Sequence, residues 1–533
     1  MQGLADMRIV DFSSWIAGPY VSKLFADAGA EVIKIEGEGG DPMRRWSSSQ
    51  AGTYDGQSDS AFFQYLNASK RSLQGQSDDA EVLALIESAD LLIEDFQAGS
   101  AELEALDVDG LRERFPHLVI LSISPYGRSG PYANRPATEF TVQAESGSVS
   151  IRGLNGQPPF MAGGKTTYFL GGASAAVAAL AAVRGARRSG RGEHIDFSLT
   201  ECMNLGSTIY MDLMFSLMGR PEMPGPIRSV ESPSIEPTRD GWVGFNTNSR
   251  QQFDDFLIMI ERPDLIGDEG LASAWGRIAR MDEWDEIVRA WTTQHTTEEI
   301  IEQAGLLRIP VAPVLNGQSV VEHEQFKARG VFEKNPGGDF LQPRPPYLVD
   351  GQRLTTPGPA PRLGEHNGAI APRERPAVAD PAAPADQLPL AGVRILDATG
   401  WWAGPLATQT LAGLGADVIH LESVQRLDGA RTVIAVAAGE QWWEKGHLFN
   451  GTNTNKRSLT LDLNQPRGLA LMKSLIAECD IVVENFSPRV FEHFGLDADS
   501  VRKLNPNAVF ARLPAFGLDG PWRDRVGFAQ TRE

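Results

Sequence analysis

The chain has 533 residues, of which 42% are hydrophobic, and its formal net charge is −20. This length exceeds that of one compact domain, so we expect several domains. The acidic balance argues against a nucleic-acid-binding protein, whose binding face is normally basic. Two cysteines, Cys202 and Cys479, cannot form a disulfide framework and favour a reducing, cytoplasmic location.

Membrane and metal signals are weak in this sequence. The N-terminal residues MQGLADMRIVDF contain no basic segment followed by an apolar one, so no signal peptide is expected. The most apolar stretch, residues 168–183, is rich in Ala and Gly and predicts a buried helix rather than a membrane span. The eight histidines are scattered without metal-ligand spacing, so no metal site is predicted.

Residues 7–36 predict a strand, a helix and a second strand. Ile9 and Val10 favour a strand, and Ala17-Gly18-Pro19 ends it. Pro19 suits the first turn of a helix, where its missing N–H costs nothing. A βαβ unit favours a parallel sheet with a ligand crevice at the carboxyl ends of its strands. The predicted fold class is therefore α/β.

Further elements of the same kind follow along the chain. Strands are predicted at residues 91–93, 118–121 and 194–199, and a helix rich in small residues at 172–184. Residues 200–330 change to Met, Trp and polar helical patterns, which indicates a smaller second domain. The Pro- and Ala-rich residues 363–388 predict an extended, solvated linker.

The opening pattern occurs a second time. Asp11, Ala17-Gly18-Pro19 and Glu36 recur 386 positions later as Asp397, Ala403-Gly404-Pro405 and Glu422, which indicates an internal duplication. The match continues over these residues: Asn67, Lys70, Arg71 and Ser72 recur as Asn453, Lys456, Arg457 and Ser458; after an insertion of four residues, Glu94, Phe96, Gly127 and Gly130-Pro131 recur as Glu484, Phe486, Gly517 and Gly520-Pro521.

The duplication predicts the domain order. We expect a first large domain at 1–200, a small α+β domain at 201–330, a segment returning to the large domain at 331–362, the linker at 363–388, and a second, incomplete large domain at 389–533.

Several local patterns leave their function open. The first turn lacks G-x-G-x-x-G, so a dinucleotide oxidoreductase is disfavoured. The helix after Pro19 either faces an anionic ligand or only begins after a tight turn. The basic pairs Arg44-Arg45 and Lys70-Arg71 indicate either phosphate binding or a solvated charged face. Trp401-Trp402 and Trp442-Trp443 favour core positions over stacking on a base.

Catalytic groups are harder to find. The glycine-rich region 153–175 contains Lys165 and Tyr168 but neither Asp nor Glu. No histidine has a local context that supports a Ser-His-Asp set.

Together these motifs resemble the family III CoA-transferases, the group of formyl-CoA transferase, carnitine CoA-transferase and α-methylacyl-CoA racemase. The similarity is carried by the duplicated residues above and by four further segments in the first repeat: Ser122-Ile123-Ser124, Gln143-Ala144 with Ser146-Gly147, Gly190-Arg191-Gly192, and Glu322-His323 with Arg329-Gly330. It covers the first repeat from end to end and all of the visible second repeat.

The resemblance implies a Rossmann-like large domain with a parallel sheet plus a smaller domain, and an interlocked homodimer or, here, an intramolecular pseudo-dimer. It implies transfer of CoA between an acyl-CoA and a carboxylic acid, with CoA as a substrate, no separate cofactor and no nucleic-acid or membrane partner. The implied CoA-binding residues are Ala17, Gly18, Asn67, Lys70, Arg71 and Phe96, and Ala403, Gly404, Asn453, Lys456, Arg457, Asn485 and Phe486.

The family mechanism also implies an aspartate that forms a mixed anhydride and then an enzyme-bound CoA thioester. Tyr168 stands at the matching position, so we predict no catalytic residue there. The histidine that a racemase would need is replaced by Thr138, and Asp95 stands where the second repeat has the more usual Asn485. In the second repeat the nucleophile position falls beyond Glu533.

Three functions therefore remain open. We expect a fused CoA-transferase in which the second repeat supplies the nucleophile from a part beyond Glu533, so that the natural protein is longer. The alternatives are an acyl-CoA racemase or isomerase on the same fold, and a CoA-binding half without catalytic activity. The acyl group and the acceptor acid are not predicted.

Overall fold

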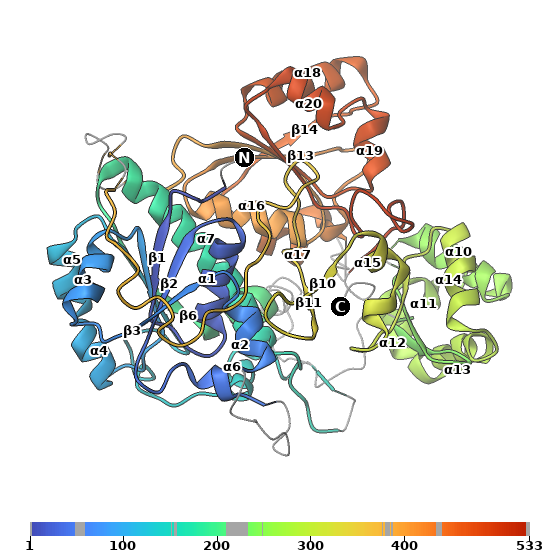
Figure 1. The fold of residues 1–533 in the computed structure, drawn as a ribbon. Coiled ribbons are helices and arrows are strands. Elements are labelled where there is room, and N and C mark those ends of the chain that lie inside the picture. Colours follow the sequence, from blue (N-terminus) through green and yellow to red (C-terminus); the bar gives the residue numbers. More distant parts are fainter. Residues whose placement is uncertain are drawn as a thin grey trace. The chain divides into compact units, whose positions relative to one another are not determined.

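The computed structural model describes residues 3–47, 59–150, 152–153, 157–208, 233–247, 249–375, 377–378, 384, 387–432 and 440–528 (Figure 1). It divides into two compact units. Unit 1 comprises Met1–Arg152, Pro159–Ile209 and Val331–Ala391, and unit 2 comprises Gly153–Pro158, Tyr210–Gly330 and Gly392–Glu533.

Unit 1 is built around a six-stranded parallel sheet with the strand order β3-β2-β1-β4-β5-β6. This is the order of doubly wound nucleotide-binding sheets. Its central strands β1, β4 and β5 are buried at every position because helices cover both faces. The strands are β1 (Arg8–Asp11), β2 (Glu31–Glu36), β3 (Arg71–Gln74), β4 (Leu91–Glu94), β5 (Val119–Ser124) and β6 (His194–Ser198).

The helices of unit 1 follow the alternation that the sequence predicts. They are α1 (Ala17–Asp27), η1 (Pro42–Arg45), α2 (Ala61–Leu66), α3 (Ala80–Glu87), α4 (Ala101–Leu106), α5 (Val108–Arg114), α6 (Glu139–Glu145), α7 (Thr166–Ser189), α8 (Leu199–Met203) and η2 (Asn204–Thr208).

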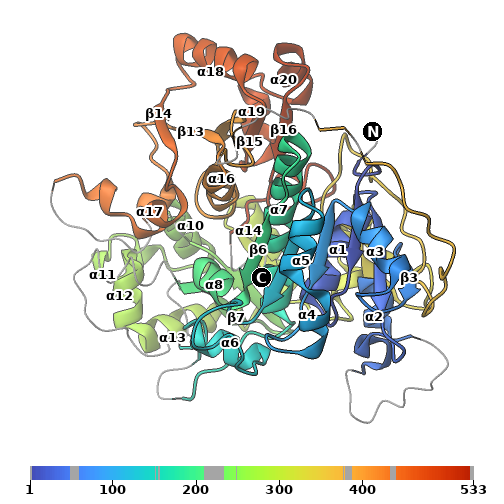
Figure 2. The same cartoon turned by 90° about the vertical axis from the view of Figure 1, so that its left-hand side faces the viewer.

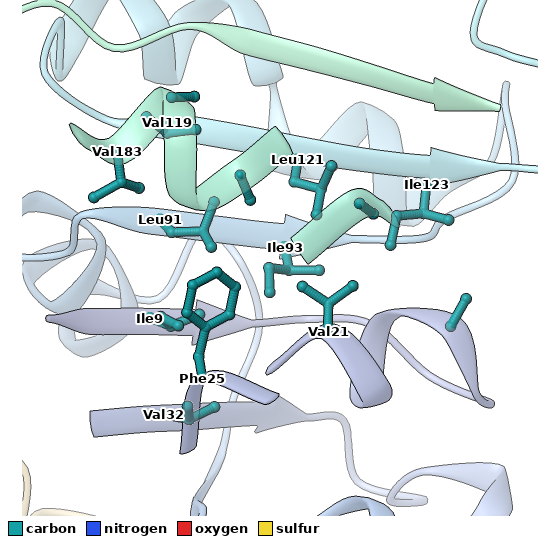
Figure 3. Close-up of a cluster of buried hydrophobic side chains, with 14 of the residues drawn as sticks. Ile9, Val21, Phe25, Val32, Leu91, Ile93, Val119, Leu121, Ile123 and Val183 are labelled. Atoms are coloured by element: carbon teal, nitrogen blue, oxygen red, sulfur yellow. The ribbon is translucent and has the colours of Figure 1, made fainter. Parts of the chain in front are cut away.

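Two apolar clusters lie on the two faces of this sheet. Helices α1 and α7 cover one face, where Val21, Phe25 and Val183 pack against Ile9 and Leu91 (Figure 3). Helices α3, α4 and α5 cover the other face in a cluster of their own (Figure 1). The sheet therefore forms the middle layer of a three-layer unit.

Helix α7 is the element with the strongest apolar character. Within the described ranges it is the one helix long and apolar enough to cross a membrane, judged by length and composition. In the structure it packs on α1 and β5, and half of its apolar window is buried. The stretch thus forms a core helix, as its Ala/Gly content predicts.

The return segment of unit 1 forms an antiparallel pair, β10 (Phe332–Lys334) with β11 (Leu341–Pro343). The chain beyond it is attached to the large domain as far as Arg375. His366 N–H donates to Ser72 O (2.9 Å), Ile370 is buried in the α3–α5 cluster, and Arg373 reaches Asp90. This first part of the predicted linker is therefore anchored to the large domain at a few points, and most of its residues are exposed as predicted.

The small domain of unit 2 combines a three-stranded antiparallel sheet with helices. The strands are β7 (Ile235–Pro237), β8 (Trp242–Phe245) and β9 (Val311–Pro313); the helices are α10 (Arg250–Met259), η3 (Pro263–Leu265), α11 (Glu269–Ala272), α12 (Ala274–Ala279), α13 (Met281–Thr292), α14 (Thr297–Leu306), η4 (Val320–Glu322) and α15 (Glu324–Ala328). Phe253, Phe256 and Trp284 fill its core.

The second repeat reproduces the first five strands in the equivalent order, β14-β13-β12-β15-β16, all parallel. The strands are β12 (Arg394–Ala398), β13 (Asp417–Glu422), β14 (Arg457–Thr460), β15 (Ile481–Glu484) and β16 (Val509–Arg512); the helices are α16 (Ala403–Gly413), η5 (Gly429–Arg431), η6 (Trp442–Lys445), α17 (His447–Thr452), α18 (Pro466–Glu478), α19 (Pro488–His493) and α20 (Ala498–Leu504) (Figure 2).

The repeated α/β architecture confirms the predicted fold class, and two local predictions need correction. Strand β3 is missing from the predicted elements because its first residues, Arg71 and Ser72, belong to a polar motif and not to an apolar run. Trp402 and Trp443, expected in the core, are 40% and 38% exposed.

Candidate functional site

The candidate site lies where the chain connections diverge, between β1 and β4 in unit 1. In doubly wound sheets, ligands bind outside the carboxyl ends of the strands at this point. Two loops meet there: residues 12–16 after β1, and Asp95-Phe96 after β4. In unit 2 the corresponding loops follow β12 and β15. Four predicted CoA-binding segments lie in or directly after these loops: Ala17-Gly18, Phe96, Ala403-Gly404 and Asn485-Phe486.

A buried ion pair holds the first turn of α1. Lys70 Nζ lies 3.2 Å from Asp11 Oδ2 and donates to Asn67 Oδ1 (2.8 Å) and to Pro19 O (3.0 Å). The hydroxyl groups of Ser13 and Ser22 also donate to the Asp11 carboxylate. Asn67 and Lys70 therefore fix the turn from inside the protein, and both are buried.

Both charges of this pair are affected by burial. Burial alone would raise the pKa of Asp11, but Lys70, Lys34 and the two serine hydroxyls outweigh it, so this pKa lies below its usual value. Burial, reinforced by repulsion from Lys34, lowers the pKa of Lys70 to about 8 despite its contact with Asp11. Both groups are thus charged at neutral pH.

The second repeat builds the same network with different hydroxyl donors. Lys456 Nζ lies 2.9 Å from Asp397 Oδ2 and donates to Asn453 Oδ1 and Pro405 O, both at 2.8 Å. Thr399 and Thr408 take the places of the serines. Burial favours a higher Asp397 pKa, but His420, whose Nδ1 lies 3.1 Å away, and Lys456 lower it overall.

The glycine of each turn is required by close packing. A Cβ atom on Gly18 would lie 2.2 Å from the Ser13 side chain, and one on Gly404 would lie 2.5 Å from Thr399 Cβ. Both distances are far below van der Waals contact, so a larger residue would push the turn out of place. Ala17-Gly18 and Ala403-Gly404 are thus fixed at the start of the helix that follows the first strand of each repeat.

In each repeat, the residue after the neighbouring strand bonds the loop after the first strand. Asp95 accepts the Ser14 N–H (2.9 Å), while Asn485 both donates to Gly400 O (2.8 Å) and accepts its N–H (2.9 Å). Burial raises the pKa of Asp95 well above its usual value, and Glu94 adds repulsion. Asp95 and Asn485 thus hold the same place in the two repeats, each bonded to the loop after the first strand.

The aromatic residue beside this bridge is also held alike in both repeats. Phe96 N–H donates to Glu94 Oε2 and Phe486 N–H to Glu484 Oε2, each at 2.9 Å. The buried glutamates, however, pair with arginines from different positions: Glu94 with Arg128 of the loop after β5, and Glu484 with Arg512 of β16. Phe96 is half-buried against Phe12, and Phe486 is exposed.

Two predicted residues do not lie at this end of the sheet. Arg71 pairs with Glu31 (3.1 Å) and Arg457 with Asp417 (2.7 Å). Glu31 and Asp417 are the first residues of β2 and β13, so both ion pairs lie at the amino end of these strands. The structure therefore separates Arg71 and Arg457 from Asn67, Lys70 and their counterparts.

The structure separates the members of each basic pair: Arg44 and Lys70 are buried, whereas Arg45 is exposed and the Arg71 side chain is partly exposed. Arg44 is buried, bonds Glu36 (2.6 Å) and Asp59 (2.6 Å), and lies over the Phe63 ring at 4.0 Å. Lys70 is buried in the Asp11 network. The solvated face is therefore wrong for Arg44 and Lys70, and phosphate binding stays a prediction.

The arginine cluster is duplicated as well, which the sequence comparison missed. Arg431 pairs with Glu422 (2.7 Å) and lies over the Phe449 ring at 3.5 Å. Glu422 was recognised as the counterpart of Glu36, but the one-residue shift of Arg431 relative to Arg44 hid the second pair.

The start of α7 carries the position at which the resemblance implies an aspartate. Tyr168 is half-buried there, and burial, with the nearby Glu139, raises its pKa. Glu139 is a buried carboxylate from α6: its Oε1 accepts the Thr167 N–H (3.3 Å) and its Oε2 lies 3.6 Å from Lys165 Nζ. Thr138 caps α6 and so fixes Glu139 at this place.

Glu139 is the carboxylate that the sequence search missed. It lies 28 positions before Thr167 in the sequence, and only the fold, through α6, brings it to the start of α7. Gln143, one turn further along α6, accepts Ala162 N–H (2.9 Å) and donates to Ala162 O (3.1 Å), so the helix also holds the glycine-rich loop. The capping box at Thr138 and Thr141 was the available local signal.

Helix α7 links this position to the first turn of α1. A Cβ atom on Gly172 would lie 2.9 Å from Ala17 O, and the Phe169 ring meets the Tyr20 ring edge-on at 4.8 Å. The Ala17-Gly18-Pro19 turn and the Tyr168 helix start are thus neighbours. Among the described residues, no group of three or more His, Cys, Asp or Glu side chains could hold a metal ion.

Comparison with known proteins gives consistent matches. A probable CoA-transferase of Mycobacterium tuberculosis, Rv1866, is 30% identical over 526 residues, which are 95% of this chain and 64% of the relative. This chain thus spans less than two thirds of that relative. The succinate–glutarate CoA-transferase of Agrobacterium fabrum is 28% identical, covering 69% of this chain and 94% of its own length. The succinyl-CoA:mesaconate CoA-transferase of Haloarcula hispanica is 30% identical, with coverages of 69% and 96%.

A solved structure and a family model agree with these matches. A CAIB/BAIF family protein from Brucella suis aligns with a TM-score of 0.60 and 25% identity, over 69% of this chain and 98% of the other. The family model described as CoA-transferase family III matches residues 4–367 and 390–532, that is, both repeats and the small domain. The chain therefore belongs to CoA-transferase family III.

Proposed function

We propose that this protein acts in the transfer of CoA between an acyl-CoA thioester and a carboxylic acid. The observation that carries the proposal is the first helix turn held by the same Asp-Asn-Lys network in both repeats, in a chain that belongs to this family. Relatives named as CoA-transferases of succinate, glutarate and mesaconate support an acid acceptor. CoA is then a substrate, and no further cofactor is needed.

In this proposal, CoA lies against the turns Ala17-Gly18 and Ala403-Gly404 and beside Phe96 and Phe486. The buried residues Asn67, Lys70, Asn453 and Lys456 act as positioning residues, because their polar groups already bond the turn. Asp95 and Asn485 each bond the loop after the first strand of their repeat and so position it. Arg71 and Arg457 contribute only through their ion pairs with Glu31 and Asp417, at the other end of the sheet.

The chemistry requires an enzyme carboxylate. Its oxygen attacks the thioester carbonyl, the C–S bond breaks, and a mixed anhydride and a CoA thiolate form. The thiolate then attacks the enzyme carbonyl of the anhydride, releasing the first acid and leaving an enzyme-bound thioester. The acceptor acid enters through the same two steps in reverse. Tyr168 cannot form such an anhydride, so the first repeat binds CoA without supplying this nucleophile.

The test compares the chain with its Tyr168→Asp variant, using succinyl-CoA. We expect the unchanged chain to bind CoA reversibly in calorimetry and to show no covalent adduct in intact-mass spectrometry. Tyr168→Asp places a carboxylate at the α7 start, and we expect it to accumulate a CoA thioester that hydroxylamine removes. Tyr168→Asn is the matched control without a nucleophile.

The alternatives give different results in the same experiment. A thioester in the unchanged chain that disappears in Glu139→Gln would assign the nucleophile to Glu139 and contradict the assignment to the Tyr168 position. Exchange of the α-hydrogen of a 2-methylacyl-CoA for deuterium without any adduct would favour a racemase. Reversible binding by all variants would favour a CoA-binding half without catalysis, which the presence of Tyr168 makes the second candidate.

A further inference from the structure

A buried histidine of the second repeat stands where the first repeat has a lysine. His420 in β13 lies 386 positions after Lys34 in β2. Each is the register partner of the buried aspartate on the neighbouring strand, Lys34 of Asp11 and His420 of Asp397. Lys34 is 1% and His420 2% exposed. The two side chains therefore occupy equivalent places in the two sheets.

In the first repeat this lysine is a permanent cation that holds the loop after β1. Lys34 Nζ donates to Ser13 O (2.7 Å) and pairs with Oδ2 of Asp41 (2.8 Å), the residue that caps η1. Burial alone would lower the pKa of Lys34, but the nearby carboxylates, Asp41 foremost, outweigh it, so this pKa lies above its usual value. The loop is thus tied to a side chain whose charge is constant near neutral pH.

The second repeat keeps the capping aspartate but not the lysine. Asp428 caps η5 as Asp41 caps η1. The N–H of Asp428 donates to Glu422 (3.0 Å), and that of Asp41 donates to Glu36 (2.9 Å). Oδ1 of Asp428 also accepts the N–H of Trp401 (2.9 Å), in the loop after β12. The counterpart of Asp41 therefore bonds this loop directly.

His420 acts on two carboxylates that hold the loop after β12. Its Nδ1 lies 3.1 Å from Asp397 Oδ2, and Asp397 Oδ1 accepts the N–H of Thr399 (3.1 Å). Asp428 holds Trp401, whose φ of 70° is left-handed and needs support in a residue other than glycine. His420 Nε2 and Asp428 Oδ2 are both buried, and neither has a hydrogen-bond partner among the described residues. The ring and Asp428 thus each leave one polar atom unused.

The buried charges around His420 balance only when one proton is bound. Glu422 and Arg431 form an ion pair, and Lys456 pairs with Asp397, so Asp428 has no cation of its own. Burial, with repulsion from Glu422, raises the pKa of Asp428. Helix α16, which also packs on β13, carries no charged residue. The groups around the ring are Asp397 of β12, Lys456 before β14, Asp428 and Arg431 of η5, Glu422 of β13, and the Phe449 ring of α17, edge-on at 5.8 Å.

We propose that His420 is a proton-dependent positioning residue, which holds the loop after β12 when its ring is protonated and releases it when the ring is neutral. In the neutral ring the hydrogen sits on Nδ1, because the Asp397 carboxylate only accepts. A second proton, on Nε2, supplies a donor and a positive charge for Asp428, as Lys34 does for Asp41. Asp428 then stays ionised, and its bond from the Trp401 N–H is charge-assisted.

The sign of the pH dependence follows from this charge. Histidine changes its charge between about pH 5 and 8, where lysine does not. Below this range the loop is held. Above it Asp428 is buried without a cation, which favours opening of η5 and of the loop toward water. The consequence for CoA rests on the proposed function, since Ala403-Gly404 directly follow this loop.

The test is amide hydrogen exchange of the whole chain without CoA, followed by mass spectrometry over residues 399–404 and corrected for the intrinsic effect of pH. Between about pH 5.5 and 7.5 we expect exchange in the unchanged chain to become about fivefold faster or more. His420→Lys restores the residue of the first repeat, so exchange should be slow at both pH values. His420→Gln takes up no proton, so exchange should be fast at both.

The first repeat provides the converse variant. Lys34→His should give residues 13–18 the pH dependence that residues 399–404 have in the unchanged chain. The matched control is His447→Gln. His447 is also buried in the second repeat, but burial lowers its pKa to about 4, so it is neutral over this pH range and its replacement should leave the dependence unchanged.

The proposal is overturned if the unchanged chain shows no pH dependence in residues 399–404, or if His420→Gln or His420→Lys retains it. Circular dichroism checks that each variant is folded. If His420→Lys does not fold, Lys34→His decides, and the absence of a new pH dependence in residues 13–18 overturns the proposal. Calorimetry with CoA at the same two pH values tests the proposed function separately: failure to bind CoA at either pH contradicts that function, while the exchange result still decides the role of His420.

Discussion

At the scale of single residues, the duplicated polar residues are chiefly buried pairs. The motif Asn-x-x-Lys-Arg-Ser combines two different roles: Lys70 points into the protein toward Asp11, and the next residue, Arg71, reaches a carboxylate at the sheet edge. Successive side chains along an extended chain point to opposite sides, which explains why Lys70 and Arg71 have different partners. Recurrence of the motif in both repeats therefore reflects the fold as much as any ligand.

Lys70→Met should destabilise the protein far more than Arg71→Ala. Removal of the amine leaves the Asp11 carboxylate buried without its cation, which costs about 3–5 kcal/mol of unfolding free energy. The exposed pair of Arg71 with Glu31 contributes no more than about 1 kcal/mol. Urea unfolding followed by far-UV circular dichroism measures both variants, and equal losses would contradict the buried-pair assignment.

At the scale of elements, close helix packing positions the candidate site. Helix α7 approaches α1 at glycine positions, and this contact brings the Tyr168 helix start beside the Ala17-Gly18-Pro19 turn. The four-residue insertion of the second repeat has an equally simple effect: α18 has 13 residues where α3 has 8, so about one extra turn is added and the same face stays buried.

Gly172→Ala should destabilise the large domain although alanine favours helices. The added methyl group would lie 2.9 Å from the Ala17 carbonyl oxygen and 3.0 Å from the Tyr20 ring, so α1 and α7 must separate. We expect a loss of about 1–3 kcal/mol, measured as a shift in the denaturant midpoint. Gly163→Ala, where a Cβ meets nothing within 4 Å, is the control and should be neutral. A stabilised Gly172→Ala variant would show that the helices do not pack so closely.

At the scale of the whole molecule, the small domain of the first repeat shares unit 2 with the sheet of the second. Trp522, which follows β16, is buried in the core cluster of the small domain together with Trp284 and Trp291. Two segments more than two hundred residues apart in sequence thus form one apolar core. The predicted homodimer or intramolecular pseudo-dimer remains a prediction.

Trp522→Ala should therefore weaken the small domain rather than the second repeat alone. Truncation of a buried tryptophan leaves a cavity and costs about 3–5 kcal/mol. Amide hydrogen exchange followed by mass spectrometry should show faster exchange in α10, α13 and α14. In Tyr132→Ala, the exposed counterpart in the first repeat, stability should change by no more than about 0.5 kcal/mol. Unchanged exchange in the small domain would mean that its core does not need the indole.

The sequence by itself determined the βαβ alternation, the duplication and the family, because these rest on local periodicity and on repeated spacing. Only the tertiary structure decided what the recurring side chains do. Lys70 meets Asp11 across 59 positions, Glu139 reaches the start of α7 through a separate helix, and Gln325 binds a loop about 190 residues away. Such pairings depend on how strands and helices pack together in the folded protein. A buried charge needs a partner within the protein because water no longer solvates it. The turn at Ala17-Gly18-Pro19 could be read from the sequence, but the ion pair that holds it could not.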